Sequence, residues 1–144
     1  MEGSEVRPLF DINLPARPSA ASQARRSLSV LAGQMSEEIY EDVRILVTEL
    51  VTNSVRHSGS ANDDDVRIVI WTDPLLLRVE VADSGSGFEK IVKPSSPDQC
   101  GGWGLQIVDR LSDRWGVKRT NGTGSAVWFE IDTDRRGTHS GIRA

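Results

Sequence analysis

The pattern of apolar and polar positions divides the chain into alternating strand and helix segments. Apolar residues recur at helical spacing in residues 18–33, 36–57 and 104–113. Ser36, which is followed by two acidic residues, is typical of a helix start. Short runs of β-branched and aliphatic residues predict strands. The predicted strands are residues 9–14, 66–71, 75–82, 115–120 and 125–131.

Turn residues between the strands predict how the strands pair. Residues 72–74 and 121–124 each separate two strand segments, so each pair is expected to form an antiparallel hairpin. The order strand, two helices, two strands, loop, helix, two strands favours an α/β (α+β) fold. We expect a two-layer sandwich in which helices cover one face of a mixed, mostly antiparallel sheet. Residues 1–132 are expected to form one domain and the polar, basic residues 133–144 a flexible tail.

Composition limits the classes of function. A net charge of −4 and a pI near 5.2 argue against nucleic-acid binding, which normally uses a basic face. No apolar run approaches the ~18 residues of a membrane-spanning helix. Residues 1–10 lack the apolar core of a secretory signal, and Cys100 is the only cysteine, so we expect a cytoplasmic protein.

The predicted helix of residues 36–57 has two distinct sides. One side is predicted to pack on the sheet, and it comprises Val43, Val47, Leu50, Val51 and Ser54. Glu49, Asn53 and His57 form a separate stripe. An Asn oxygen can bind Mg²⁺, and a Glu one turn earlier can accept a proton from a hydroxyl or water that attacks a phosphate. Taken alone, this spacing is also typical of a solvated helix surface, and His57 is explained as a group that offsets the helix dipole.

Asp83 ends a strand and shares the parity of its core-facing aliphatic residues. A buried carboxylate needs a partner, and the exocyclic amine of adenine, or a water beside it, provides one. Gly85 and Gly87 follow at once and allow close backbone approach, although this segment alone also fits a flexible turn. Ser125 has the core-facing parity of the last strand, so its hydroxyl is expected to support Asp83 through water.

Three glycines open the helix that follows the loop of residues 88–100. Gly101, Gly102 and Gly104 can present backbone N–H groups and the positive end of a helix dipole to phosphate. The same glycines also fit a hinge for the preceding loop. The two interpretations are compatible, because a hinged loop over phosphates is a lid.

Together, these segments resemble the GHKL (Bergerat-fold) ATP-binding superfamily, and especially its small bacterial anti-sigma-factor serine/threonine kinases. The motifs are Glu49-Leu-Val-Thr-Asn53, Asp83-Ser-Gly-Ser-Gly87 and Gly102-Trp-Gly104-Leu105, and the resemblance covers about residues 8–132. It implies that Glu49 is the catalytic base, that Asn53 is the metal ligand for Mg²⁺ and that Asp83 reads the adenine of ATP. The candidate cofactor-binding residues are Asn53, Asp83, Gly85, Gly87, Gly101, Gly102, Gly104, Leu105 and Ser125. Ser125 stands where the family often has threonine.

The resemblance also implies partners. It implies a homodimer that binds a sigma factor and phosphorylates an anti-anti-sigma (antagonist) protein, with residues 88–101 as the ATP lid. We therefore expect an ATP-dependent protein serine/threonine kinase that regulates transcription by partner switching. One alternative is a nucleotide-binding module that sequesters a partner without phosphotransfer. Another is a stand-alone histidine-kinase-type ATPase domain, which is disfavoured because no His precedes the helix that carries Glu49.

Overall fold

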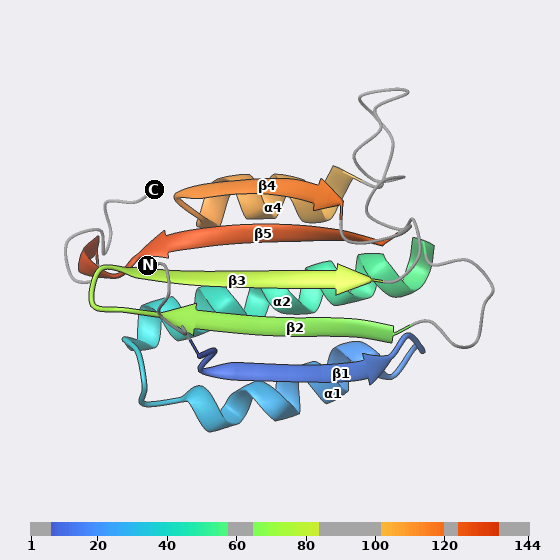
Figure 1. The fold of residues 1–144 in the computed structure, drawn as a ribbon, viewed down its shortest axis with the longest axis horizontal. Helices are drawn as coiled ribbons and strands as arrows, with labels where there is room; N and C mark the ends of the chain where they lie inside the picture. The colour runs from blue at the N-terminus through green and yellow to red at the C-terminus, as the bar shows by residue number, and fades with distance from the viewer. Residues whose placement is uncertain (1–6, 58–64, 84–101, 120–123, 136–144) are drawn as a thin grey trace.

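The computed structural model describes residues 7–57, 65–83, 102–119 and 124–135, which form two layers (Figure 1). One layer is an antiparallel sheet with the strand order β1-β2-β3-β5-β4, and the helices lie on one of its faces. The strands are β1 (Phe10–Pro15), β2 (Asp65–Thr72), β3 (Leu76–Asp83), β4 (Arg114–Arg119) and β5 (Ser125–Asp132). The helices are α1 (Ala20–Leu28), α2 (Glu37–His57) and α4 (Gly102–Leu111), with short 3₁₀ turns η1 (Ser29–Leu31) and η2 (Thr133–Arg135). The predicted two-layer α+β sandwich is confirmed.

Helix α2 is the central element of the helix layer. It contacts α1 and α4 as well as β2 and β3. Its start is the predicted one, because the Ser36 hydroxyl oxygen accepts the backbone N–H of Ile39 at 3.2 Å, which is an N-cap hydrogen bond. Its predicted sheet-facing residues, including Ser54, are fully or almost fully buried. The apolar stripe therefore fixes which side of α2 meets the sheet.

The inner face of the sheet follows the alternation along β3. Leu77, Val79 and Val81 are fully buried, and Asp83 is the last member of the same row. In the sheet, Asp83 lies opposite Val66 of β2 and Ser125 of β5. The core row of β3 therefore ends in a carboxylate that has neighbouring strands on both sides.

Some predicted boundaries differ from those of the structure. The helix expected over residues 104–113 is α4, which starts two residues earlier and ends at Leu111. The backbone N–H of Ser112 still donates to the carbonyl of Val108 at 3.0 Å, but that of Asp113 donates to the carbonyl of Glu130 in β5 at 2.8 Å, so the helical bonding pattern ends there. The helix expected to reach residue 33 ends as α1 at Leu28 and passes into η1, and Gly33 has a left-handed φ of 90°.

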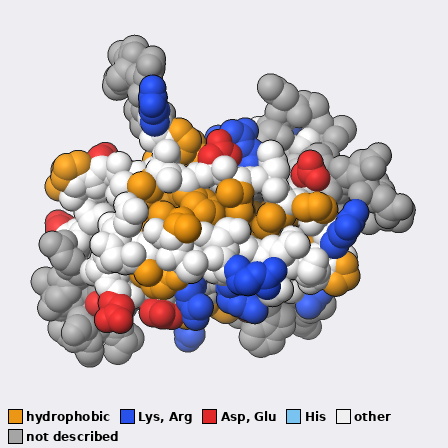
Figure 2. Space-filling view, turned by 90° about the horizontal axis from the view of Figure 1, so that it is seen from below, with side chains coloured by type: hydrophobic (Ala, Val, Ile, Leu, Met, Phe, Trp, Pro, Cys, Tyr) orange, Lys and Arg blue, Asp and Glu red, His pale blue; other side chains and the backbone are white. Residues whose placement is uncertain are grey.

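Other segments pack at the β1 edge of the sheet and at the β2–β3 turn. Figure 2 shows a band of apolar side chains, with charged ones around it, at the edge formed by β1 and α1; β1 supplies the half-buried Ile12 and Leu14. After β5, the Thr133 hydroxyl donates to the Pro74 carbonyl at 2.7 Å. The first residues of the predicted tail therefore contact the β2–β3 turn, whereas residues 136–144 lie outside the described residues.

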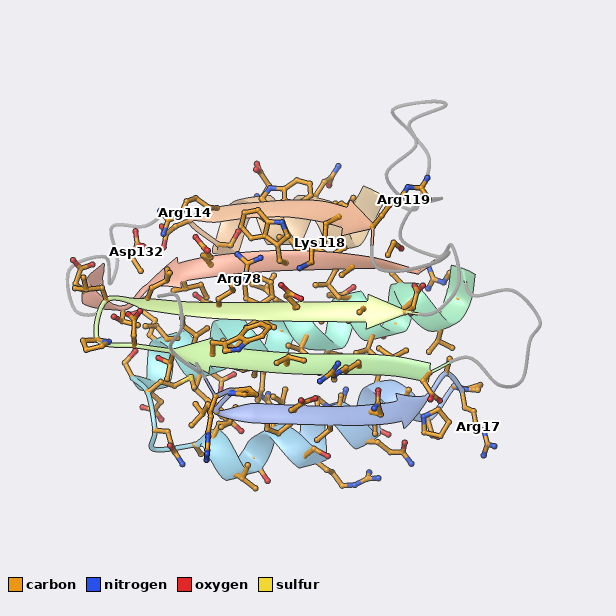
Figure 3. The ribbon with its side chains drawn as sticks, in the orientation of Figure 1. Arg17, Arg78, Arg114, Lys118, Arg119 and Asp132 are labelled. Atoms are coloured by element: carbon orange, nitrogen blue, oxygen red, sulfur yellow. The ribbon has the colours of Figure 1, made fainter. Side chains whose placement is uncertain are left out.

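The outer face of the sheet carries a network of ion pairs (Figure 3). Arg78 donates to Glu80 at 3.1 Å and to Glu130 at 2.9 Å, and Arg114 donates to Glu130 at 2.8 Å. Lys118 donates to Glu80 at 3.0 Å. The network therefore joins β3, β5 and β4 through side chains that lie across the strands.

The described helices include none that is long and apolar enough to cross a membrane.

The ion-pair network predicts a pH dependence of stability. Chiefly the hydrogen bond from Arg114, helped by Arg78, holds the pKa of Glu130 below its ordinary value of 4.5. A carboxyl whose pKa is lower in the folded chain stabilises the fold above its unfolded pKa, and this contribution is lost as the pH falls through the folded pKa. Glu130→Gln should therefore flatten the fall in the free energy of unfolding below about pH 5, as measured by urea unfolding at several pH values. Parallel curves for the native and variant chains would contradict this assignment.

Candidate functional site

Four polar residues are buried where β3 ends. They are Asn53 and Ser54 of α2, Asp83 of β3 and Ser125 of β5, with exposed fractions of 4, 0, 4 and 2 %. Within the described part of the chain, these are the only polar or charged residues that are buried. Burial of a polar group costs free energy unless a partner compensates it. Their concentration in one place therefore marks a candidate site.

The carboxylate of Asp83 is fixed by two elements. The Ser54 hydroxyl donates to Asp83 Oδ2 at 3.3 Å, which ties the C-terminal half of α2 to the end of β3. In the strand ladder, Asp83 and Ser125 are directly opposite each other and share the core-facing side of the sheet. A helix and two strands thus converge on one acceptor group.

Two buried polar atoms of the same cluster have no hydrogen-bond partner among the described residues. They are Nδ2 of Asn53 and Oγ of Ser125. A buried donor or acceptor without a partner costs roughly 1–3 kcal/mol. A polar ligand that enters this end of the sheet can recover that free energy, so the arrangement fits a binding site better than a structural core.

Glu49 lies one helical turn before Asn53 and is half-buried. Thr52 and Val55 line a hollow together with Ala21, so that side of α2 faces α1. Helical spacing places Asn53 nearly opposite Val55, toward the side of α2 that meets α4. The predicted stripe of an acid and an amide therefore borders the buried cluster.

The start of α4 lies at the same end of the sheet as the end of α2 and the end of β3 (Figure 1). Gly102 and Gly104 form the first turn of α4, whose N-terminus provides unpaired N–H groups and a positive dipole end. Leu105 is half-buried and packs against the core. The structure thus brings a helix N-terminus to the same end of the molecule as the polar cluster.

Other predicted site residues cannot be placed in this way. Gly85, Gly87, Gly101 and the lid expected over residues 88–101 lie outside the described residues, and the side chain of His57 is not described either. Their roles stay predictions.

Ser54 is a functional candidate that motif reading overlooked. Its position on the apolar side of α2 predicted packing, and its burial agrees with that prediction. The overlooked signal was chemical, because a serine on the sheet side of a helix needs a hydrogen-bond partner. Asp83, with the buried parity of β3, was the obvious partner once both elements were placed in one sandwich.

Comparison with known proteins adds a family context. The chain matches the family described as histidine kinase-like ATPase domain over residues 14–131. It is 33 % identical over 118 residues to the serine-protein kinase RsbW of Listeria monocytogenes serotype 4a, covering 71 % of this chain and 74 % of that protein. It is 30 % identical to the serine-protein kinase RsbW of Bacillus pumilus over an alignment 151 positions long, which covers 92 % of this chain and 91 % of that protein.

A solved structure has a similar fold. It is the histidine kinase domain from the blue-light activated histidine kinase EL346 of Erythrobacter litoralis, with a TM-score of 0.57 and 19 % identity. The similarity covers 96 % of this chain and 68 % of the solved one. At this identity, the likeness concerns the arrangement of helices and strands.

The two buried serines predict opposite effects of the same substitution. Ser125→Ala removes an unpaired hydroxyl, so without ligand the free energy of unfolding should stay the same or rise by up to ~1 kcal/mol. Ser54→Ala removes the donor to Asp83, so the free energy of unfolding should fall by about 1–3 kcal/mol. Urea unfolding of both variants without nucleotide measures the difference. A greater loss from Ser125→Ala than from Ser54→Ala would contradict the hydrogen-bond assignment.

Proposed function

Because the chain belongs to the histidine kinase-like ATPase family, and within it to the serine-protein kinases of the RsbW type, we propose that it is an ATP-dependent protein serine/threonine kinase that regulates transcription as an anti-sigma factor. The observation that carries the proposal is the buried cluster at the end of β3. It combines the Asp83 carboxylate with unpartnered polar atoms of Asn53 and Ser125.

The buried cluster fits the adenine base of ATP. The Asp83 carboxylate is an acceptor that can form a hydrogen bond with a donor such as the exocyclic amine of adenine. The Ser125 hydroxyl, which makes no hydrogen bond among the described residues, can donate and accept and so suits a base edge or a water beside it. The neighbouring apolar residues Val66 and Val81 are fully buried and keep water out of this end of the core.

The neighbouring groups fit the phosphates and their metal. Asn53 carries an amide whose Nδ2 has no partner among the described residues, and the amide oxygen is the kind of neutral ligand that Mg²⁺ accepts. Mg²⁺ usually keeps waters and substrate phosphates as its other ligands, so one protein oxygen suffices. The N-terminus of α4, with Gly102 and Gly104, would bind phosphate oxygens through backbone N–H groups. Bound ATP supplies the phosphoryl group.

Glu49 would act as the base that accepts the proton of the attacking serine or threonine hydroxyl. It is half-buried on the same side of α2 as Asn53, so a hydroxyl near the phosphates can meet it while solvent reaches its outer edge. Positioning of the hydroxyl and neutralisation of phosphate charge provide most of the rate enhancement of phosphoryl transfer, and the catalytic base increases the rate further.

We propose the partners from the same premise. The chain would form a homodimer, bind a sigma factor and phosphorylate an anti-anti-sigma protein in the cytoplasm. Phosphorylation adds about −1.5 to −2 charges and three acceptor oxygens to the antagonist. An antagonist that carries this charge would release the kinase, which is then available to hold the sigma factor.

Asp83→Asn should abolish ATP binding. The substitution keeps the size of the side chain, but its amide places a donor where the carboxylate accepts the adenine amine. Calorimetric titration with ATP and Mg²⁺ measures the loss. Asp73→Asn is the matched control, because Asp73 caps the β2–β3 turn far from the site and the Asn oxygen can still accept its backbone N–H groups. Native affinity in Asp83→Asn would refute the adenine assignment.

Glu49→Ala should leave ATP binding unchanged and lower phosphotransfer by about 10²–10⁴-fold, because a positioned base contributes a factor of that size. The assay is transfer from radiolabelled ATP to the anti-anti-sigma protein that co-purifies with the native chain. Glu41→Ala, an exposed site on the same helix, is the control and should transfer normally.

Normal transfer by Glu49→Ala would show that the base is another group. ATP binding without transfer by the native chain would favour the alternative of a module that sequesters its partner.

A further inference from the structure

The hydroxyls of the two buried serines beside Asp83 have different surroundings. Ser54 is fully buried, and its hydroxyl donates to Asp83 Oδ2 at 3.3 Å. Ser125 lies opposite Asp83 in the strand ladder, yet its hydroxyl makes no hydrogen bond among the described residues. The Ser54 hydroxyl is therefore committed to the carboxylate, whereas that of Ser125 remains available to a ligand.

Strand pairing fixes the backbone of Asp83 but not the torsions of its side chain. The backbone of Asp83 is held on both sides, opposite Val66 and Ser125. Rotation of the carboxylate plane about its last side-chain bond is a broad, soft torsion. The hydrogen bond from Ser54 to Oδ2 restricts this torsion. Ser54 can make this bond because it lies on the sheet-facing side of α2.

We propose that Ser54 is a positioning residue that gives the site its selectivity for a 6-aminopurine over a 6-oxopurine by holding the Asp83 carboxylate in one orientation. This inference rests on the proposed function, since Asp83 must be the group that reads the base. It assigns to α2 a role in base recognition besides the roles of Glu49 and Asn53 in catalysis and metal binding.

The selectivity follows from donor and acceptor chemistry. An ionised carboxylate only accepts hydrogen bonds, the 6-amino group of adenine donates them, and the 6-oxo group of hypoxanthine accepts them. A carboxylate that is held in place faces the 6-oxo group acceptor to acceptor, which is repulsive in a site shielded from water. A carboxylate that lacks the hydrogen bond from Ser54 is less restrained, so it can turn further from the 6-oxo group and also binds the 6-amino group less well. Loss of the Ser54 hydroxyl should thus weaken ATP binding and spare binding of inosine triphosphate (ITP).

The test measures the Kd of ATP and of ITP, each with Mg²⁺, by calorimetry on the native chain and on Ser54→Ala. A hydrogen bond to a charged group is strong enough for about a tenfold effect on affinity. The expected result is that the ratio of the ITP Kd to the ATP Kd falls about tenfold in Ser54→Ala, mainly through a weaker affinity for ATP. Ser54→Cys keeps nearly the same side-chain volume with a poor donor, so it should shift the ratio in the same direction and serves if the alanine variant does not fold.

Ser112→Ala is the matched control. It also removes one hydroxyl that donates one hydrogen bond, at the C-terminal end of α4 and away from Asp83. It should leave both affinities and their ratio unchanged.

The outcomes separate this inference from the proposed function. If Ser54→Ala weakens ATP and ITP binding by the same factor, Ser54 has only a structural role and the inference is wrong. An unchanged ratio with unchanged affinities also overturns it, while the proposed function stands. If the native chain binds neither nucleotide, the proposed function fails, and the inference fails with it.

Discussion

The burial of one carboxylate, that of Asp83 at the end of β3, is the constraint on which the candidate site depends. Removal of a charge from water is costly unless hydrogen bonds or a partner compensate it. The chain supplies part of this compensation through the Ser54 hydroxyl at 3.3 Å. This bond requires the C-terminal half of α2 to cross over the end of β3, and the same crossing brings Asn53 and Glu49 to this end of the sheet. The position of α2, which carries the proposed catalytic base Glu49, is thereby linked to the position of Asp83, the group proposed to bind adenine.

The core and outer face of the molecule differ from the polar cluster in how fully their groups are paired. The apolar core between the helices and the sheet, and the ion pairs of Arg78, Glu130 and Arg114 on the outer face, are satisfied within the chain. At the end of β3, by contrast, Asn53 and Ser125 retain polar atoms without partners among the described residues. A site of this kind lowers the stability of the free chain and returns the free energy when a complementary ligand binds. The family to which the chain belongs, the histidine kinase-like ATPases, matches that interpretation of the cluster.

Local rules predicted much of this arrangement, and nonlocal pairing accounts for what they missed. Alternation along β3 predicted that Asp83 faces the core, and Ser36 predicted the start of α2, because each depends on a few neighbouring residues. The end of α4 was misplaced because the backbone N–H of Asp113 donates to the carbonyl of Glu130 in β5, a nonlocal bond that apolar periodicity does not detect. Ser54 was correctly placed on the sheet side, but its bond to Asp83 joins positions 29 residues apart and depends on how α2 crosses the sheet. The pairing of Asp83 with Ser125 depends on strand order and register, which a hairpin pattern alone does not specify.

We propose that the polar cluster at the end of β3 is an adenine-nucleotide site. Calorimetric titration of the native chain with ATP and with ADP, each with and without Mg²⁺, tests it most directly. We expect saturable binding of one nucleotide per chain, with ATP bound more tightly when Mg²⁺ is present, because Asn53 and the phosphates would share the metal. Absence of heat of binding for both nucleotides under both conditions, with the chain shown to be folded, would show that the cluster is not a nucleotide site.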